Sequence, residues 1–301
     1  MNTNQRLIDE IQLLKKQKNA VILSHVYQDS EIQDIADYVG DSLALSKKAI
    51  RTNAEIILFC GVKFMAETAH ILNPEKTILL PHSNAGCDLA DMATIEQLMN
   101  KKQEYPNAAV VCYINSSAKI KAESDICCTS ANALKIVQSL KEEKIIFLPD
   151  RNLGEYVEEQ TSKKIIRWNG YCYVHEDINP KAIESLKQKH PTSEVIVHPE
   201  CNKKVRDLAD CIGGTAKMSS YVKESDCNDF IVGTEDNFIH HLKKHNPNKT
   251  FHPVNTKCKG MRKITLEDVK ESLEKQKINI TLLEPIRLKA KKTLENMMNL
   301  S

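Results

Sequence analysis

The chain repeats one pattern three times, with a period of about 85 residues. A cysteine follows each group of three β-like apolar runs, and these cysteines, Cys87, Cys172 and Cys258, are 85 and 86 residues apart. A chain with ten cysteines can give an evenly spaced trio by chance, so this spacing alone is weak evidence. Two further sets keep the same phase at intervals of 88 and 85 residues: His25, Tyr113 and His198, and Ser42, Ser130 and Thr215. The sequence therefore predicts three related units.

The apolar runs alternate with helical stretches, which favours an α/β fold with parallel sheets. Nine strands are predicted, at residues 21–26, 55–60, 77–81, 109–114, 144–149, 164–168, 194–199, 229–234 and 249–254. We predict three homologous αβα three-layer domains with short parallel sheets around a pseudo-threefold axis. Their expected bounds are 1–92 with an N-terminal helix, 93–178, and 179–301 with C-terminal helices, of which the first begins at an N-cap, Thr265.

Charge and apolar patterning narrow the classes of function. The 42 basic and 40 acidic residues give a net charge of +2, which argues against nucleic acid or a membrane surface as the main partner. The N-terminal stretch has no signal-peptide core, and no apolar run is long enough to cross a bilayer. We expect a cytoplasmic protein in which the cysteines are buried thiols or metal ligands, because disulfides are rare in that compartment.

Three repeated cysteines suggest a metal centre with one open position. Ligands of open α/β sheets bind beyond the carboxyl ends of the strands, so units whose strand ends face inward would bring Cys87, Cys172 and Cys258 together. Three thiolates are one short of the ligands of a structural zinc site or of a fully ligated [4Fe–4S] cluster. An unligated iron could act as a Lewis acid, and the dehydration of a hydroxy acid suits it. The repeat predicts a three-cysteine cluster of the dehydratase type.

Three hydroxyl residues in repeat phase suggest an anion site. Ser42, Ser130 and Thr215 each resemble the N-cap of a following helix, and helix N-termini attract carboxylates and phosphates. Any one of them alone would be an ordinary cap for its own helix. Their common phase favours a shared role in substrate binding.

Polar pairs at the strand ends suggest proton transfer. They are spaced i and i+2 on equivalent strands, which points both members to the same side: His25 with Tyr27, Tyr113 with Asn115, and His198 with Glu200. Histidine is the usual group for proton transfer near neutral pH, although a lone histidine at a strand end is more often structural. The alignment of all three pairs favours a catalytic site.

Several long segments resemble the quinolinate synthase family. They lie at residues 24–49, 60–92, 113–133, 147–157, 198–201, 232–235 and 261–268, and the similarity runs from about residue 5 to beyond residue 270. The resemblance implies three homologous αβα domains around a pseudo-threefold axis. It also implies an enzyme of NAD biosynthesis that condenses iminoaspartate with dihydroxyacetone phosphate to quinolinate, with loss of phosphate and two waters. Functional coupling to L-aspartate oxidase is a further expectation.

The resemblance also assigns residues. Cys87, Cys172 and Cys258 match the ligands of one [4Fe–4S] cluster per chain. The residues matching the active site are His25, Tyr27, Ser42, Tyr113, Asn115, Ser130, His198, Glu200 and Thr215. We expect proton transfer from Glu200 with His198 and Tyr27. Tyr113 and Asn115 would position the intermediate, and the three hydroxyl residues would hold carboxylates or phosphate.

Two alternatives remain open at the level of sequence. A different [4Fe–4S] hydro-lyase acting on a small hydroxy acid would keep the cluster and change the substrate. A non-enzymatic metal sensor or scaffold would fill every coordination position and would have no pocket with paired proton-transfer groups. The converging polar residues favour an enzyme over the sensor.

Overall fold

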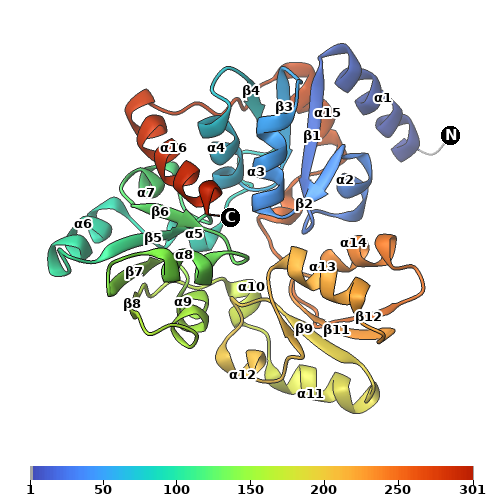
Figure 1. Ribbon diagram of the computed structural model, residues 1–301. Helices are drawn as coiled ribbons and strands as arrows, with labels where there is room; N and C mark the ends of the chain where they lie inside the picture. Colours follow the sequence, from blue (N-terminus) through green and yellow to red (C-terminus); the bar gives the residue numbers. More distant parts are fainter. Residues whose placement is uncertain (1–2, 301) are drawn as a thin grey trace. The chain divides into compact units, whose positions relative to one another are not determined.

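A computed structural model describes residues 3–300 of the chain (Figure 1). Within these residues, the twelve strands form three four-stranded sheets, and every strand pairing is parallel. The central strands are almost wholly buried, which explains why they read as continuous apolar runs in the sequence. The predicted α/β class with three parallel sheets is confirmed.

The first sheet contains β1 (Ala20–His25), β2 (Tyr38–Gly40), β3 (Ile56–Cys60) and β4 (Thr77–Leu79). The helices of this part of the chain are α1 (Thr3–Gln17), α2 (Ser30–Ile35), α3 (Ser42–Arg51) and α4 (Lys63–Leu72). The short helix η1 (Met261–Lys263) and α15 (Leu266–Lys275) return to it from the C-terminal region. α1 packs against α15, and α3 packs against α4.

The second sheet contains β5 (Ala109–Tyr113), β6 (Ile126–Cys128), β7 (Lys144–Leu148) and β8 (Lys164–Arg167). Its helices are α5 (Asp88–Asp91), α6 (Ile95–Glu104), α7 (Ala118–Ala122), α8 (Ala133–Ser139), α9 (Arg151–Glu158) and α10 (Tyr173–Glu176). α6 packs against α7, and α8 packs against α9 in the way that α3 packs against α4.

The third sheet contains β9 (Glu194–Val197), β10 (Cys211–Ile212), β11 (Asp229–Gly233) and β12 (Thr250–Pro253). Its helices are α11 (Pro180–Lys189), α12 (Lys203–Arg206), α13 (Thr215–Glu224) and α14 (Phe238–His245), and α16 (Glu284–Asn299) ends the described chain. α11 packs against α12 and α13 against α14, the same two pairings as in the second sheet.

The three sheets share one topology, which supports the predicted internal repeat. Their strand orders are β2-β1-β3-β4, β6-β5-β7-β8 and β10-β9-β11-β12. All nine predicted strands are present. The prediction missed the edge strand that begins each order, because two or three residues are too few to show a pattern. The cysteines of the repeat therefore follow the fourth strand of each sheet.

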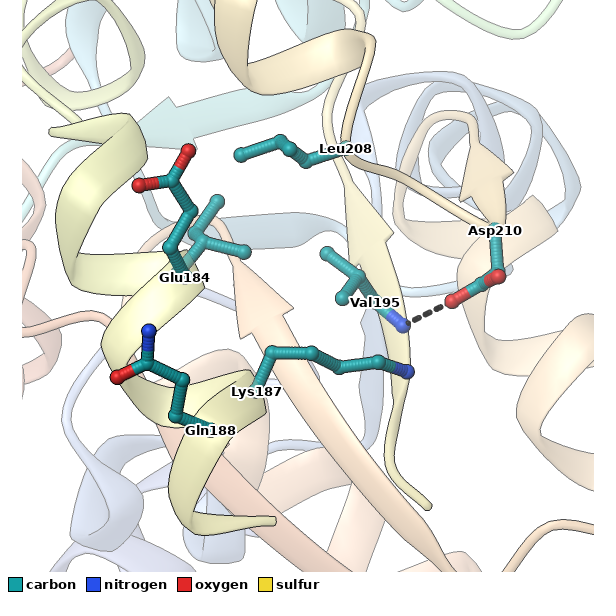
Figure 2. Close-up of a pocket in the computed structure, with 7 residues that line it drawn as sticks. Glu184, Lys187, Gln188, Val195, Leu208 and Asp210 are labelled. Carbon is teal, nitrogen blue, oxygen red and sulfur yellow. Dashed lines mark hydrogen bonds between the residues drawn. The ribbon is translucent and has the colours of Figure 1, made fainter. Parts of the chain in front are cut away.

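A repeated aspartate fixes each of these edge strands. Asp37, Asp125 and Asp210 directly precede β2, β6 and β10, and they lie 88 and 85 residues apart. In each case the carboxylate accepts a hydrogen bond of 2.8 Å from a backbone N–H of the neighbouring strand, at Ile22, Val110 and Val195 respectively. Figure 2 shows the third of these bonds. This set was not predicted, although its intervals equal those of the sets that begin with His25 and Ser42.

A lysine in each repeat caps the C-terminus of a helix that occupies the same position in the three repeats. Lys163 donates to the carbonyl of Leu140 at 2.7 Å, Lys249 donates to that of Ser225 at 2.6 Å, and Lys76 donates to that of Thr52. These carbonyls belong to the C-cap residues of α8, α13 and α3. A cation at this position satisfies orphan carbonyls and opposes the negative end of the helix dipole. Two independent sets of contacts thus carry the same threefold repeat.

The chain divides into two compact units. Unit 1 contains Met1–Cys87 and Cys258–Arg287, and unit 2 contains Asp88–Lys257 and Leu288–Ser301. Unit 1 holds the first sheet, and unit 2 holds the second and third. The predicted three-domain bounds and the pseudo-threefold axis stay predictions.

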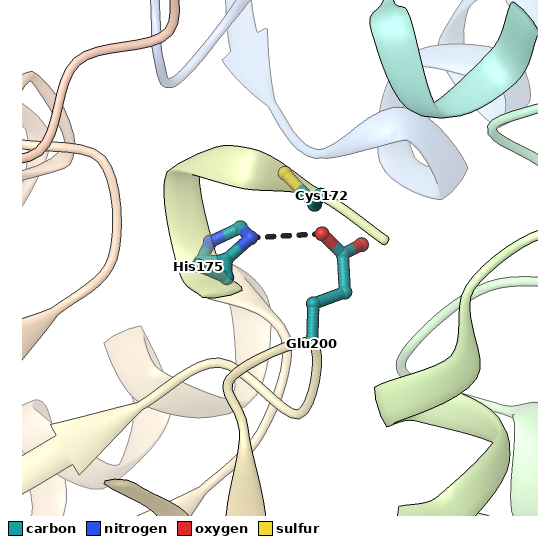
Figure 3. Close-up of side chains that lie close together, drawn as sticks. All are labelled: Cys172, His175 and Glu200. Atoms are coloured by element: carbon teal, nitrogen blue, oxygen red, sulfur yellow. Dashed lines mark hydrogen bonds and ion pairs between the residues drawn. The ribbon is translucent and has the colours of Figure 1, made fainter. Parts of the chain in front are cut away.

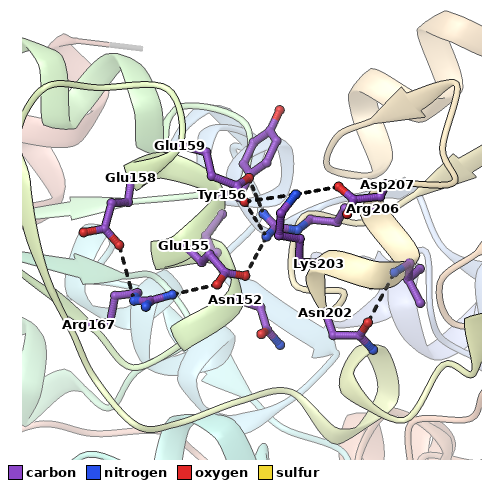
Figure 4. A network of polar contacts seen from close by, with 12 residues as sticks. Asn152, Glu155, Tyr156, Glu158, Glu159, Arg167, Asn202, Lys203, Arg206 and Asp207 are labelled. Atoms are coloured by element: carbon purple, nitrogen blue, oxygen red, sulfur yellow. Dashed lines mark hydrogen bonds and ion pairs between the residues drawn. The ribbon is translucent and has the colours of Figure 1, made fainter.

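Within unit 2, α9 and α12 are joined by a buried arginine (Figure 4). The Arg206 guanidinium lies 2.8 Å from a Glu155 carboxylate oxygen and 3.3 Å from one of Glu159. Burial of a charge is costly unless it is paired, and two carboxylates pair this one. The contact links the second sheet to the third.

Among residues 3–300, each helix is too short or too polar to span a bilayer.

Candidate active site

His25 and Tyr27 form a tight turn at the end of β1 in unit 1. His25 Nδ1 accepts a hydrogen bond of 3.2 Å from the Tyr27 backbone N–H, and the two rings meet edge to face at 4.7 Å. The same turn recurs in unit 2, where His198 Nδ1 accepts from the Glu200 N–H at 3.3 Å. In both rings an Nδ1 that accepts a backbone proton leaves Nε2 as the donor of the neutral imidazole. The strand-end pairs are therefore structurally equivalent.

Glu200 is the centre of the polar cluster in unit 2. It is buried, and Tyr113 at the end of β5 donates its hydroxyl to Glu200 Oε1 at 2.5 Å. His175 Nδ1 lies 2.8 Å from the other carboxylate oxygen, Oε2. Asn152, at the start of α9, donates to the Glu200 carbonyl at 2.9 Å. Both carboxylate oxygens and the backbone are thus held by partners from three separate segments.

These partners keep Glu200 ionised. Burial by itself raises the pKa of this carboxyl, but the His198 and His175 imidazoles and the Tyr113 hydroxyl outweigh it and lower the pKa to about 2. Asp150 is buried nearby, and burial together with the Glu200 charge raises its pKa well above the usual value. Opposite shifts in two neighbouring carboxyls are typical of catalytic sites.

The tautomer of His175 follows from its two contacts. An ionised Glu200 can only accept, so His175 Nδ1 carries the proton of that 2.8 Å bond. His175 Nε2 lies 2.8 Å from Thr234 Oγ1, and Thr234 donates to it when the ring is neutral. His175 also stacks on His198, with the ring centroids 4.5 Å apart. A chain of hydrogen bonds therefore runs from Thr234 through His175 to Glu200.

Cys172 lies beside this chain (Figure 3). The donor atoms of Cys172, His175 and Glu200 all lie within 4.8 Å of one another. Cys172 is the N-cap residue of α10, and its backbone N–H donates to Asp150 Oδ2 at 3.1 Å. The structure thus brings one predicted ligand together with three predicted catalytic residues, Tyr113, His198 and Glu200.

In unit 1, the loops that carry Cys87 and Cys258 touch through their backbones. A Cβ placed on Gly260 would lie 2.0 Å from the Gly86 carbonyl oxygen, a distance that no side chain can occupy. Glycine is therefore required for this approach. The loop continues against the turn after β1, where Gln28 contacts Met261 and the Arg262 guanidinium lies 3.6 Å from Asp29. Cys258 and the His25–Tyr27 turn are thereby tied to one another within unit 1.

Exposure separates the predicted ligands from most other cysteines. Cys87, Cys172 and Cys258 are half-buried, as is Cys227, whereas six are fully buried: Cys60, Cys112, Cys127, Cys128, Cys201 and Cys211. Burial raises the pKa of the thiols of Cys60, Cys128 and Cys201, and a protonated thiol is a poor metal ligand. Cys201, three residues after His198, packs in the core of the third sheet. The three repeated cysteines therefore have the exposure and chemistry expected of thiolate metal ligands.

The prediction that the repeated hydroxyl residues are N-caps is wrong. Asp41 caps α3 through its side chain, Asn132 is the N-cap residue of α8, and Gly214 is that of α13. Ser42 and Thr215 instead occupy the first helical position, and Ser130 lies in the turn before α8. The Asp41 carboxylate accepts from the Ala44 N–H, whereas the Asn132 side chain makes no cap hydrogen bond and Gly214 has no side chain to offer. The predicted cap of α15, Thr265, is confirmed, with a capping box to Asp268.

The N-terminus of α13 in unit 2 is open to an anion. No side chain caps α13 at Gly214, so its first N–H groups are available. Ser130 adjoins this end, because a Cβ on Gly214 would lie 2.6 Å from Ser130 Oγ. Thr215 begins the helix and is buried. Asn115, the remaining predicted residue of unit 2, lies half-buried two residues after Tyr113.

A separate pocket in unit 2 contains no predicted site residue. It has a volume of about 330 Å³ and lies between α11 and β9, lined by Ile183, Glu184, Lys187, Gln188, Val195, Leu208 and Asp210 (Figure 2). It lacks histidine, cysteine and paired proton-transfer groups. The Glu200 cluster is therefore the stronger candidate for an active site.

Sequence reasoning missed the residues that support Glu200. Asn152 and Asp150 lie in the segment after β7, and Thr234 follows β11, so each comes at a strand end in phase with the predicted sites. Their positions within the repeat could therefore have identified them from the sequence. His175 also supports Glu200, because the structure places its ring directly on the Glu200 carboxylate.

Comparison with known proteins identifies the family of the chain. Residues 9–299 match the family model described as quinolinate synthetase A protein. The chain is 52% identical over 292 residues to the quinolinate synthase of Clostridium perfringens strain 13, covering 96% of this chain and 97% of that protein. It is 50% identical over 294 residues to the quinolinate synthase of Methanosarcina barkeri, covering 97% of each. The relative from Desulforudis audaxviator is 47% identical over the full length of both chains. The chain belongs to the quinolinate synthetase A family of enzymes.

Proposed function

We propose that this protein is a quinolinate synthase that condenses iminoaspartate with dihydroxyacetone phosphate, releasing quinolinate, phosphate and two waters. The observation that carries the proposal is the match to one family of enzymes across residues 9–299, including every segment that bears a predicted site residue. The product belongs to NAD biosynthesis. The reaction would take place in the cytoplasm, functionally coupled to an L-aspartate oxidase that supplies iminoaspartate.

Cys87, Cys172 and Cys258 would hold one [4Fe–4S] cluster. Their common position after the fourth strand of each sheet supports this assignment, as does the backbone contact between the Cys87 and Cys258 loops. With three protein ligands, the cluster would supply a Lewis acid at one iron. Asp150 would help to orient Cys172, since it holds the Cys172 backbone N–H.

Glu200, His198 and Tyr27 would carry the proton transfers. Glu200 would take part because it lies at the centre of the polar cluster and both its oxygens are fixed. His198 and His25 would present Nε2–H to the substrate, since Nδ1 of each accepts a backbone N–H. Tyr113, whose hydroxyl is bound to Glu200, would position the intermediate together with Asn115.

The hydroxyl residues would bind the acidic groups of the substrates. The uncapped start of α13, with Thr215 and the adjoining Ser130, offers N–H and O–H donors to a carboxylate or phosphate. Ser42 would serve the same purpose in unit 1, where the Asp41 cap leaves fewer N–H groups available. His25 would complete the substrate contacts.

The test is an anaerobic assay of the purified protein with both substrates. Quinolinate should form only when iminoaspartate and dihydroxyacetone phosphate are present together. Protein with a full complement of iron and sulfide that makes no quinolinate would contradict the proposal and favour another [4Fe–4S] hydro-lyase.

A further inference from the structure

A second group of metal-type donors lies in unit 2, on residues that the proposed reaction does not use. His252 Nε2 lies 2.5 Å from Asp229 Oδ1, and His190 Nδ1 lies 3.8 Å from Asp229 Oδ2. One ligand atom from each of the three residues falls within 4.8 Å of the other two. All three side chains are partly exposed, so an ion can reach them from solvent.

The group lies at the end of the third sheet opposite to the Glu200 cluster. Asp229 is the first residue of β11, whereas Thr234, which contacts His175, directly follows the last. His252 lies on the edge strand β12, and His190 is the C-cap residue of α11. Helix α11 packs on β11, so the three residues join the end of a helix to two neighbouring strands.

Hydrogen bonding alone does not account for the arrangement. The short His252–Asp229 contact is one satisfied pair, but the distance from His190 Nδ1 to Asp229 is beyond hydrogen-bond range. The two imidazole rings stack with centroids 3.7 Å apart, so protonation of both would place like charges face to face. One carboxylate between two neutral imidazoles is instead the donor set preferred by borderline divalent metals.

We propose that His190, Asp229 and His252 bind a divalent transition metal of the zinc class, separate from the cysteine-bound group. His190 would donate through Nδ1, His252 through Nε2 and Asp229 through its carboxylate, with water completing the sphere. His252 then carries its proton on Nδ1 instead of Nε2, and protons compete with the metal for both imidazoles, so binding weakens at low pH.

Binding requires one local change. The metal must lie near the plane of each imidazole, and the rings are now stacked with an interplanar angle of 25°. Rotation about the terminal side-chain torsion of histidine is soft, and the His190 side chain, 34% exposed, has room to turn. The bound metal would then tie α11 to β11 and β12 and raise the melting temperature of the protein.

The test is calorimetric titration of Zn²⁺ into anaerobically purified protein, so that the repeated cysteines keep the group they hold. Wild type should bind one equivalent of Zn²⁺. His252→Gln and Asp229→Asn should each lower the affinity for Zn²⁺ at least tenfold, and Mg²⁺ should not bind. His245→Gln on α14 is the matched control, because it removes another histidine of unit 2 and should leave the titration unchanged. Equal binding by wild type and both site variants would overturn the proposal.

Cobalt distinguishes this site from the cysteines. Co²⁺ bound by nitrogen and oxygen gives no thiolate-to-metal absorption band in the near ultraviolet. One equivalent of Co²⁺ should therefore bind to the protein without this band. A strong band that survives Asp229→Asn would place the metal on cysteine and refute the site. Circular dichroism of each variant checks the fold, and His190→Gln supplies a third variant at the most exposed ligand. Quinolinate synthesis is measured separately, because its absence would leave the zinc titration interpretable.

Discussion

His175 Nδ1 lies 2.8 Å from Glu200 Oε2, and this contact joins the segment that carries Cys172 to the turn that follows β9. The two residues are buried, and each has a second polar partner, Thr234 for His175 and Tyr113 for Glu200. A buried carboxylate held on both oxygens has a fixed direction as well as a fixed charge. The contact therefore sets the position of the residue to which we assign proton transfer.

Replacing Glu200 tests that assignment. Glu200→Gln preserves the shape of the side chain and removes its charge, so turnover should fall roughly 10²- to 10⁴-fold while fold and iron content are retained. Steady-state rates of quinolinate formation, with iron counting on the same sample, decide the matter. Activity within a few-fold of wild type would remove Glu200 from the proton-transfer role.

His175 should act by positioning Glu200. In His175→Gln the carboxylate loses its second anchor, and we expect kcat to fall roughly 10- to 100-fold, the loss typical of a hydrogen bond to a charged group. Quinolinate affinity should change much less than kcat. Thr234→Ser keeps the hydroxyl that holds the ring and should behave as wild type, whereas Thr234→Val should resemble a milder form of the His175 variant. Equal losses from Ser and Val would indicate a packing role.

The cysteines should fall into two classes. Single replacement of Cys87, Cys172 or Cys258 by Ala should abolish the brown colour and lower the iron content, because each removes a ligand. The same change at Cys60, Cys128 or Cys227 should leave both intact. Iron and sulfide analysis of anaerobic protein gives the result. A colourless Cys128 variant with an intact fold would contradict this grouping of the cysteines.

The contact between the Cys87 and Cys258 loops depends on one glycine. Gly260→Ala would place a Cβ 2.0 Å from the Gly86 carbonyl, so the backbone must shift. We expect a loss of about 1–3 kcal/mol in the free energy of unfolding, together with a loss of iron. Gly86→Ala is the matched control, since its Cβ meets no heavy atom within 4 Å and its φ is not positive. Similar effects from both variants would show that the contact is unimportant.

His241 should make stability depend on pH. Burial, followed by the charges of His245 and His240, lowers the pKa of this histidine to about 4. The unfolded chain takes up the proton more readily, so His241 should reduce stability as the pH falls from about 6.5 towards 4. After allowance for its partial exposure, the expected loss is about 1–2 kcal/mol. Chemical denaturation of wild type and His241→Gln across this range should diverge below pH 6.5 and stay parallel above pH 7. Parallel curves throughout would refute the shift.

Much of the fold was predictable because each repeat contains the same series of apolar runs. A buried parallel strand excludes polar residues along most of its length, so the nine strands other than β2, β6 and β10 were found in the sequence. The edge strands β2, β6 and β10 were not, since they are held by backbone bonds and by Asp37, Asp125 and Asp210 rather than by an apolar pattern. The identity of the helix caps was missed for a related reason. Asp41 is next to Ser42 and Asn132 is two residues after Ser130, and local sequence does not say which residue takes the cap.

The sequence by itself determined the threefold repeat, the parallel α/β class, the family, and the residues placed at strand ends. Tertiary structure alone decided which of those residues meet. Glu200 is held by Tyr113, His175 and Asn152, and Gly86 touches Gly260, although these partners are far apart along the chain. Periodicity records the face on which a residue lies, whereas contact between distant segments depends on how the elements pack, and no local pattern encodes that.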